Sequence, residues 1–391
     1  MQNSIWTYPW DVLDVGLDAV VGEIHDRAGL NGISLASSYH AGKFFQPRSP
    51  VRKTYFPEDG TIYFKPRSSR FDALALQPKV AAMVEARGDV LDALIQERDR
   101  TGLAVNAWTV CLHNTRLGLL HPDACCRNAF GDVARYNLCP SHPDARAYAT
   151  ALAAELTHGY APNAVELESP NFMGYAHGYH HEKDGVGLTP EDDFLLSLCF
   201  CPACLSRAAR AGIGGEAAQR TVRRWIEETA ERALPEPRWP DFVATGPAVF
   251  DAHPEVQDYV RWRMEPVTSL VREIREAANP ASEIRFIDIK GGWLFGSDLA
   301  AIAGACDGIV FCAYDTAPEQ LARDVADAVA AASGKPVITG LRLFVPELDG
   351  PAKLAAKVQA ALSAGAAGCN FYNYGLVPAA RLDWIRAALT A

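Results

Sequence analysis

The sequence lacks a long apolar run and a leader-like start. Residues 1–11 contain no basic segment followed by an apolar one, and no hydrophobic stretch approaches the roughly 20 residues that cross a bilayer. Positive charge is also scarce, since 37 Lys and Arg stand against 47 Asp and Glu and give a net charge of −10. Binding to a nucleic-acid backbone depends on clustered cations that release counterions, so this balance argues against such a partner. We therefore expect a cytoplasmic protein that binds a neutral or cationic small molecule, without a membrane partner; the composition is also compatible with a homo-oligomer.

Nucleotide-binding glycine motifs are missing as well. Neither G-x-G-x-x-G nor G-x-x-x-x-G-K-[ST] follows any predicted strand, which argues against an open doubly wound sheet. Instead, eight strand-like runs alternate with helical segments, and this alternation predicts parallel strands covered by helices. Eight such units close a barrel, so we predict an α/β protein whose residues 1–391 form a single (β/α)8 TIM barrel. The predicted strands are Ser4–Tyr8, Ile33–Tyr39, Leu103–Leu112, Ala164–Glu168, Ile284–Lys290, Gly308–Asp315, Pro336–Phe344 and Gly368–Tyr374.

Two segments interrupt this rhythm. After the second strand, Lys53–Pro57 and Thr61–Pro66 flank an Asp-Gly pair, which predicts a β-hairpin excursion over residues 45–67. After the fourth strand, helical periodicity predicts a helical insertion over the barrel mouth at residues 171–253, and residues 113–140 are expected to form a long loop. The other predicted helices include Val12–Asp26, Val80–Thr101, Ala145–His158 with Ser141 or Asp144 as its cap, Glu191–Ala211, Glu216–Leu234 and Pro254–Ala278.

The fourth predicted strand carries two acids, Glu166 and Glu168, in the run V-E-L-E. Residues two apart in a strand share one face, so both side chains leave the same side. Two buried carboxylates are expensive to ionise, which predicts a polar pocket that tunes proton affinity. Glu168 lies nearest the strand end and is the expected catalytic acid, its proton affinity raised by repulsion from Glu166. Alternatively, one of the two acids, Glu166 more readily than Glu168, is structural and pairs with Lys290 or Arg342. An ion pair of Lys290 with Asp288 or Glu166 inside the barrel would likewise be structural.

Polar and aromatic residues end the other strands too. The carboxyl ends of barrel strands carry the active site, and aromatic faces beside carboxylates and amides suit a sugar. The loop after the fourth strand adds histidines, which lack the H-E-x-x-H spacing of a catalytic metal site. The predicted substrate-binding residues are Tyr39, His40, Asn106, Trp108, His113, Tyr175, His177, His180, His181, Lys290, Tyr314, Asp315, Arg342, Asn370, Tyr372 and Tyr374.

Ten cysteines are too few, in a chain of this length, for a disulfide scaffold, so buried thiols are expected. Cys199, Cys201 and Cys204 form C-x-C-x-x-C, which predicts a structural zinc site if a fourth ligand completes it. That ligand would be Cys125, Cys126, Cys139 or a histidine. The alternative is a helix turn with buried thiols. No other cofactor is expected.

Several stretches together resemble the (β/α)8-barrel glycoside hydrolases and their uncharacterised hydrolase-like relatives: V-E-L-E with its histidine-rich loop, L-C-P-S-H-P-D-A-R, C-F-C-P-A-C and N-F-Y-N-Y-G. In the large retaining clan of that fold, the resemblance implies a Glu acid/base ending the fourth strand and a Glu nucleophile ending the seventh. Glu168 matches the first role. The seventh strand has Arg342 instead, which leaves the second carboxylate open between Asp288, Glu347 and Asp315, in that order, or Glu166.

The resemblance and the strand-end residues together predict a glycoside hydrolase that acts on a small saccharide or glycoside, with Glu168 as general acid. Two alternatives remain. A sugar isomerase, epimerase or lyase would use Glu168, Lys290 and a histidine for proton transfer. A barrel without catalytic activity would only bind carbohydrate.

Overall fold

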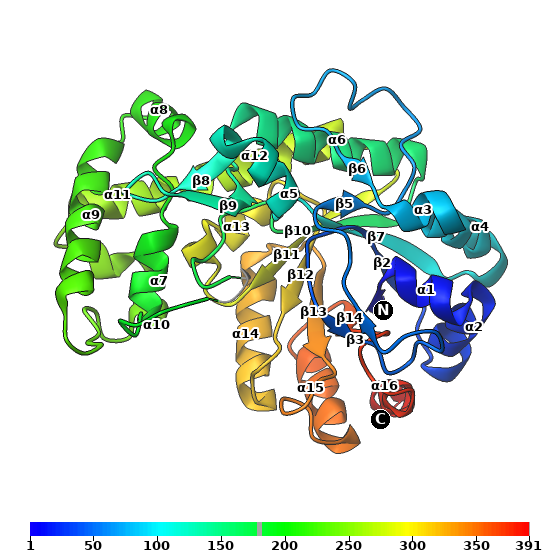
Figure 1. The fold of residues 1–391 in the computed structure, drawn as a ribbon. Coiled ribbons are helices and arrows are strands. Elements are labelled where there is room, and N and C mark those ends of the chain that lie inside the picture. Colours follow the sequence, from blue (N-terminus) through cyan, green and yellow to red (C-terminus); the bar gives the residue numbers. More distant parts are fainter. Residues whose placement is uncertain (178–181, 391) are drawn as a thin grey trace.

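The computed structural model describes residues 1–177 and 182–390, and its centre is a closed barrel of eight parallel strands (Figure 1). The first strand pairs with both the second and the last, so the sheet has no free edge within the ring. The predicted (β/α)8 barrel is therefore confirmed. In ring order its strands are β1 (Ser4–Thr7), β2 (Gly32–Tyr39), β7 (Ala104–Val110), β10 (Ala164–Glu168), β11 (Glu283–Ile289), β12 (Gly308–Cys312), β13 (Val337–Arg342) and β14 (Gly368–Tyr372).

The helices that cover the barrel are shorter and more often broken than the periodicity predicts. Gly16 and Gly88, with φ of +100° and +105°, divide the predicted Val12–Asp26 and Val80–Thr101 helices, because positive φ does not continue a right-handed helix. The side chain of His142, rather than Ser141 or Asp144, caps α6. The covering helices are α1 (Pro9–Val15), α2 (Leu17–Gly22), α3 (Ala82–Arg87), α4 (Val90–Thr101), α6 (Pro143–Gly159), α12 (Met264–Ala277), α13 (Leu299–Ala303), α14 (Pro318–Ala331), α15 (Pro351–Ser363) and α16 (Ala380–Thr390).

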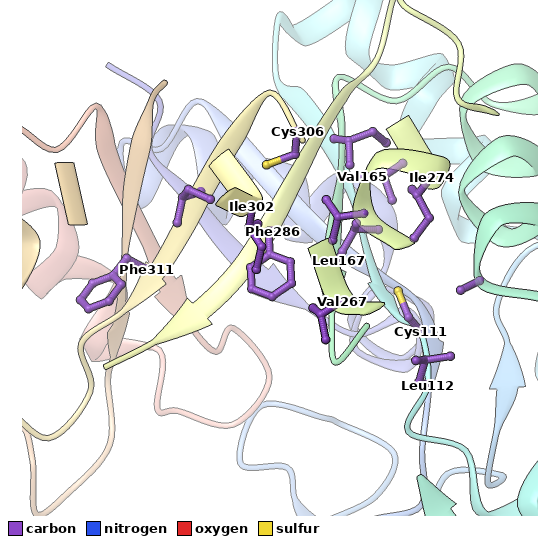
Figure 2. Close-up of a cluster of buried hydrophobic side chains, with 14 of the residues drawn as sticks. Cys111, Leu112, Val165, Leu167, Val267, Ile274, Phe286, Ile302, Cys306 and Phe311 are labelled. Carbon is purple, nitrogen blue, oxygen red and sulfur yellow. The ribbon is translucent and has the colours of Figure 1, made fainter. Parts of the chain in front are cut away.

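The apolar layer between barrel and helices decides which side chains face the barrel interior. Val165 and Leu167 of β10 belong to this layer, together with Phe286 of β11 (Figure 2). Their helical neighbours in the same view are Val267 and Ile274 of α12 and Ile302 of α13. Because strand side chains alternate, the residues between them point the other way. Glu166 and Glu168 therefore face the barrel interior.

The excursion after β2 does not contain the predicted hairpin. Its first pair joins β3 (Phe44–Phe45) to β4 (Thr54–Tyr55), while β5 (Thr61–Ile62) pairs with the end of β2 and with β6 (Lys79–Val80). Gly60 does turn the chain with φ of +61°. The run after it adds to the barrel strand because this buries Ile62 completely, which a two-stranded ribbon in solvent would not do.

Residues 113–140 are also more ordered than a loop. They form α5 (Thr115–Leu120) and an antiparallel pair of β8 (Cys125–Arg127) and β9 (Val133–Leu138). The later insertion is helical, as predicted, but the C-F-C-P-A-C segment divides its first helix because Pro202 starts a new one. These helices, green in Figure 1, lie to one side of the barrel strands. They are α7 (Pro190–Ser197), α8 (Pro202–Arg210), α9 (Gly215–Glu231) and α10 (Phe242–Thr245). The predicted helix Pro254–Ala278 that follows is divided into α11 (Pro254–Trp262) and α12. Across the two described ranges, no helix is both long and apolar enough to span a bilayer.

Candidate active site

A pocket of about 370 Å³ opens at the carboxyl ends of the barrel strands. All eight barrel strands contribute a residue to it, and the segment after β10 forms one of its walls. This is the end of a barrel at which strand-end side chains converge. The lining residues are Trp6, Tyr39, Trp108, Glu168, Ser169, Asn171, Phe172, Met173, Gly174, His177, Ile287, Asp288, Ile289, Phe295, Cys312, Tyr314, Arg342 and Tyr372.

Glu166 lies below this pocket, fully buried in the barrel. Its Oε1 accepts hydrogen bonds from Ser34 Oγ at 2.9 Å and Asn106 Nδ2 at 3.1 Å, and Asn370 Nδ2 lies 3.4 Å from both carboxylate oxygens. Burial raises the pKa of Glu166, and the guanidinium of Arg285, 3.9 Å away, is the largest opposing influence. Asn106 and Asn370, predicted to bind substrate, thus hold a buried acid instead.

The alternative in which Lys290 forms an ion pair with Glu166 or Asp288 is wrong. Lys290 Nζ binds Asp324 Oδ1 of α14 at 2.7 Å, outside the barrel, and its side chain is largely exposed. The register between β10 and β11 places Arg285, not Lys290, beside Glu166. The isomerase or lyase alternative needs a lysine near Glu168, and Lys290 does not take that position.

Glu168 reaches the pocket itself, and the indole N–H of Trp108 donates a hydrogen bond to its Oε2. Burial raises the pKa of Glu168 to about 7, while the Trp108 hydrogen bond lowers it. The cause is desolvation rather than the predicted repulsion from Glu166, whose charge is not among the influences on Glu168. A carboxyl group with a pKa near neutrality can both hold and release a proton, as a general acid or base must.

Aromatic side chains surround Glu168. The ring centroids of Trp6, Trp108 and Tyr372 lie 5.9 to 6.1 Å from one another. Tyr8, which follows the first barrel strand, lies behind them, with its hydroxyl 2.8 Å from that of Tyr372 and 3.0 Å from that of Tyr39. Burial raises the pKa of all three phenols, so the hydroxyls keep their protons. They form a neutral hydrogen-bonding surface.

Three predicted histidines gather beside the pocket. The rings of His40 and His113 stack at 3.9 Å, and His177 lies edge-on to His113 at 5.1 Å. Burial lowers the pKa of His40 to about 4 and that of His113 to about 2, so both rings are neutral near pH 7. Of the three, His177 lines the cavity. The predicted His180 and His181 lie outside the described residues.

Asp288, the first choice for a second carboxylate, borders the pocket but shares its strand face with Phe286. That face turns toward the covering helices (Figure 2). A Cβ added to Gly292 would lie 2.7 Å from Asp288 Oδ1, which places the carboxylate against the loop that follows β11. Burial raises the pKa of Asp288 to about 7.

The other two candidate carboxylates bind Arg342. Its Nη1 lies 2.8 Å from Glu347 Oε1 and 3.4 Å from Asp315 Oδ1. The guanidinium also lies 4.6 Å from the ring centre of Tyr314, and both residues line the cavity. Glu347 and Asp315 therefore do not line the pocket themselves; they bind Arg342, which does.

Two further predicted residues have other roles. Tyr374 accepts a hydrogen bond from Arg48 Nη2 at 3.0 Å and donates one to Glu23, away from the pocket. Tyr175 is half-exposed and borders a neighbouring cavity. Sequence reasoning missed Cys312 and the wall residues Phe172, Met173 and Phe295. They are apolar, so nothing in their chemistry distinguishes them from core residues.

Four cysteines meet next to this region. The sulfur atoms of Cys139, Cys199, Cys201 and Cys204 lie within 4.8 Å of one another, and all four are buried. Cys139 Sγ is 3.4, 3.6 and 3.9 Å from the sulfurs of Cys204, Cys201 and Cys199. Four thiolates around zinc, with Zn–S bonds of about 2.3 Å, would be about 3.8 Å apart, so the geometry fits. Backbone N–H groups also donate to three of the sulfurs, from Ser141 to Cys139, from Arg127 to Cys199 and from Cys204 to Cys201.

A closed parallel barrel with a polar and aromatic pocket at its carboxyl end is the architecture shared by many glycoside hydrolases. No protein-family model and no curated protein matches the sequence. Solved structures do share the fold. An α-L-fucosidase isoenzyme 2 from Paenibacillus thiaminolyticus is similar with a TM-score of 0.59 at 14% identity. A β-galactosidase from Marinomonas ef1 has a TM-score of 0.58 at 12% identity, and one from Halorubrum lacusprofundi 0.59 at 14%.

These similarities establish the fold. Each covers all of this chain but only 49%, 59% and 58% of the respective relatives, so the chain spans about half to three fifths of their length.

Proposed function

We propose that the protein is a glycoside hydrolase acting on a small saccharide or glycoside, with Glu168 as the general acid. The observation that carries the proposal is the position of Glu168. It faces the pocket from the end of the fourth barrel strand, and burial raises its pKa to about 7. The barrel's likeness to a fucosidase and two β-galactosidases adds support. A cavity of about 370 Å³ favours a small ligand.

Each side chain around Glu168 has a task in this reaction. Protonated Glu168 donates its proton to the glycosidic oxygen as that bond breaks, and Trp108 N–H orients the carboxyl group. The faces of Trp6 and Trp108 stack against sugar C–H bonds, while the hydroxyls of Tyr39 and Tyr372 bond sugar hydroxyls. Arg342 adds a donor on the far wall.

Hydrolysis of a panel of aryl glycosides by the wild type and by Glu168→Gln tests the proposal. Loss of the acid should lower kcat/KM about 10²- to 10⁴-fold on a cleaved substrate. Glu216→Gln, an exposed glutamate of α9, is the matched control and should retain full activity. Unchanged turnover by Glu168→Gln refutes the assignment. Saturable sugar binding without product would indicate a carbohydrate-binding barrel instead.

We also propose that Cys139, Cys199, Cys201 and Cys204 hold a structural zinc ion. With four sulfur ligands the coordination shell is closed, so zinc would supply stability rather than catalysis. It would join the end of β9 to the α7–α8 segment. Purified protein should contain one zinc per chain by elemental analysis, and Cys204→Ser should lose it and lower the Tm. Cys306→Ser, a buried thiol elsewhere, is the control for loss of a cysteine. Metal-free protein with four titratable thiols contradicts the proposal.

A further inference from the structure

Arg263 is a cation buried without a carboxylate. It lies where α11 ends and α12 begins, and it is fully buried. Its Nη1 lies 3.4 Å from the carbonyl oxygen of Leu294, while Nε and Nη2 have no hydrogen-bond partner among the described residues. No carboxylate in that part of the chain pairs with it. A buried charge is costly unless it is paired, so this position calls for an anion.

Two phenylalanine rings offset only part of this cost. The guanidinium carbon of Arg263 lies 4.5 Å from the ring centre of Phe172 and 5.4 Å from that of Phe194. Aromatic faces attract cations, but a ring carries no net charge, and this attraction is much weaker than the cost of an unpaired buried ion. The charge of Arg263 is therefore not balanced by its aromatic neighbours.

Cysteine thiols are the nearby groups that metal binding turns into anions. Burial lowers the pKa of Arg263, while Tyr259 and the thiols of Cys126, Cys199 and Cys204 raise it, so these groups lie close enough to act on its charge. Tyr259, one turn earlier in α11, donates a hydrogen bond to the carbonyl oxygen of Cys199 at 2.6 Å. This bond holds the end of α11 against the cysteine segment.

These three thiols differ in their roles. Cys126 Sγ donates a hydrogen bond to Asn137 Oδ1 at 3.1 Å, so it carries a proton and is not an anion. Cys199 and Cys204 belong to the four-sulfur cluster, whose members lose their protons when they bind zinc. Four thiolates around Zn²⁺ leave a net charge of −2. Without the metal, protonated thiols offer Arg263 much less negative charge.

We propose that Arg263 is the counter-ion of the zinc centre. The inference rests on the zinc site proposed above and adds the residue that makes a doubly negative, buried centre tolerable. The guanidinium and the thiolates stabilise each other when zinc is bound, because all four sulfurs are then anions. Arg263 therefore strengthens zinc binding, and in the metal-free protein it is a destabilising, uncompensated charge.

Arg263 also connects the zinc centre to the pocket wall. Phe172, whose ring lies under the guanidinium, lines the cavity, and its N–H donates to the carbonyl oxygen of Phe295 at 3.1 Å. A Cβ added to Gly296 would lie 2.9 Å from Phe172 Cδ2 and 3.1 Å from the carbonyl oxygen of Arg263, so this region has no spare room. Loss of zinc would thus leave an unbalanced cation directly behind the wall.

Zinc affinity tests this role. The zinc dissociation constant is measured on the full-length wild type and variants by competition with a chromophoric chelator under reducing conditions. Arg263→Met removes the charge and keeps an apolar chain, so the dissociation constant should rise about tenfold or more. Arg263→Lys keeps the charge and should lose less affinity. Arg261→Met, at an exposed arginine of α11, is the matched control and should bind zinc as the wild type does.

Thermal unfolding with and without zinc separates a counter-ion from a residue that only packs. With excess zinc, the Tm of Arg263→Met should fall below that of the wild type. In EDTA this deficit should shrink or reverse, because the unpaired cation is gone. Arg263→Gln, also uncharged, provides the same comparison if the methionine variant does not fold.

The outcomes distinguish this inference from the zinc site itself. An unchanged zinc dissociation constant in Arg263→Met overturns the inference while the zinc site stands. Equal losses of affinity in the lysine and methionine variants, or an equal Tm deficit with and without zinc, do the same. A wild type that binds no zinc overturns both.

Discussion

Trp108 and Glu168 form a donor–acceptor pair across neighbouring barrel strands. The register pairs Trp108 with Glu166, and the indole N–H of Trp108 reaches one pleat further, to Glu168 Oε2. The aromatic ring therefore both lines the pocket and stabilises the ionised acid. Burial pushes the pKa of Glu168 upward and the indole opposes it, with a pKa of about 7 as the result.

Removing the indole donor should shift the pH profile. Glu168 acts as an acid when protonated, so kcat/KM on a cleaved glycoside should fall as pH rises above about 7. Trp108→Phe keeps an aromatic ring but loses the N–H that lowers this pKa. The alkaline limb should therefore move to higher pH. Trp384→Phe, in α16, is the control and should leave the profile in place. A limb that moves to lower pH contradicts the pairing.

Glu168 should also make stability depend on pH. Its folded-state pKa, about 7, exceeds the value of 4.5 for a free glutamate. Its contribution to stability is therefore fully present below about pH 4.5 and is lost as pH rises through 7. The Glu168→Gln side chain cannot ionise. The Tm of this variant minus that of the wild type should therefore be larger at pH 8 than at pH 5. Scanning calorimetry at both pH values measures this difference. A difference independent of pH would mean that Glu168 is solvated.

Arg285 and Glu166 should be energetically coupled. Both are buried, with Arg285 Nη1 at 3.9 Å from Glu166 Oε1. Arg285→Met leaves a buried acid without its counterion and should lower the free energy of unfolding by about 3–5 kcal/mol. The double variant Glu166→Gln/Arg285→Met should recover much of this loss. Urea denaturation of the four proteins completes the cycle. Additive losses would show that the two charges do not interact.

Gly340 of β13 gives the pocket floor its shape. A Cβ there would lie 2.8 Å from Cys312 Sγ and 3.0 Å from Trp6 Cη2, two residues that line the cavity. Gly340→Ala should displace both side chains, lower stability by about 1–3 kcal/mol and raise KM on a cleaved substrate. Gly304→Ala, at the end of α13 with a nearest contact of 3.4 Å, is the matched control. Unchanged KM in Gly340→Ala would place the sugar elsewhere.

The candidate site was predicted in part. The V-E-L-E alternation correctly assigned Glu166 and Glu168 to one face. Val165 and Leu167 are apolar and pack against the covering helices, so the two acids between them must point into the barrel. The fifth strand, E-I-R-F-I-D-I, has apolar residues on both faces, so its pattern does not reveal where Asp288 points. Packing of Phe286 against the helices decides that (Figure 2). Strand register likewise decides that Arg285, not Lys290, meets Glu166.

By itself, the sequence determined the eight-strand barrel and the inward direction of Glu168, since periodicity and the alternation of strands with helices are local properties of the chain. Only the tertiary structure decided which distant groups meet. Cys139 joins three cysteines at least 60 residues away, and Thr61–Ile62 pairs with a barrel strand rather than with its neighbour in sequence. Such contacts depend on how elements pack in space, where burial of apolar surface and of backbone polar groups selects one partner among many.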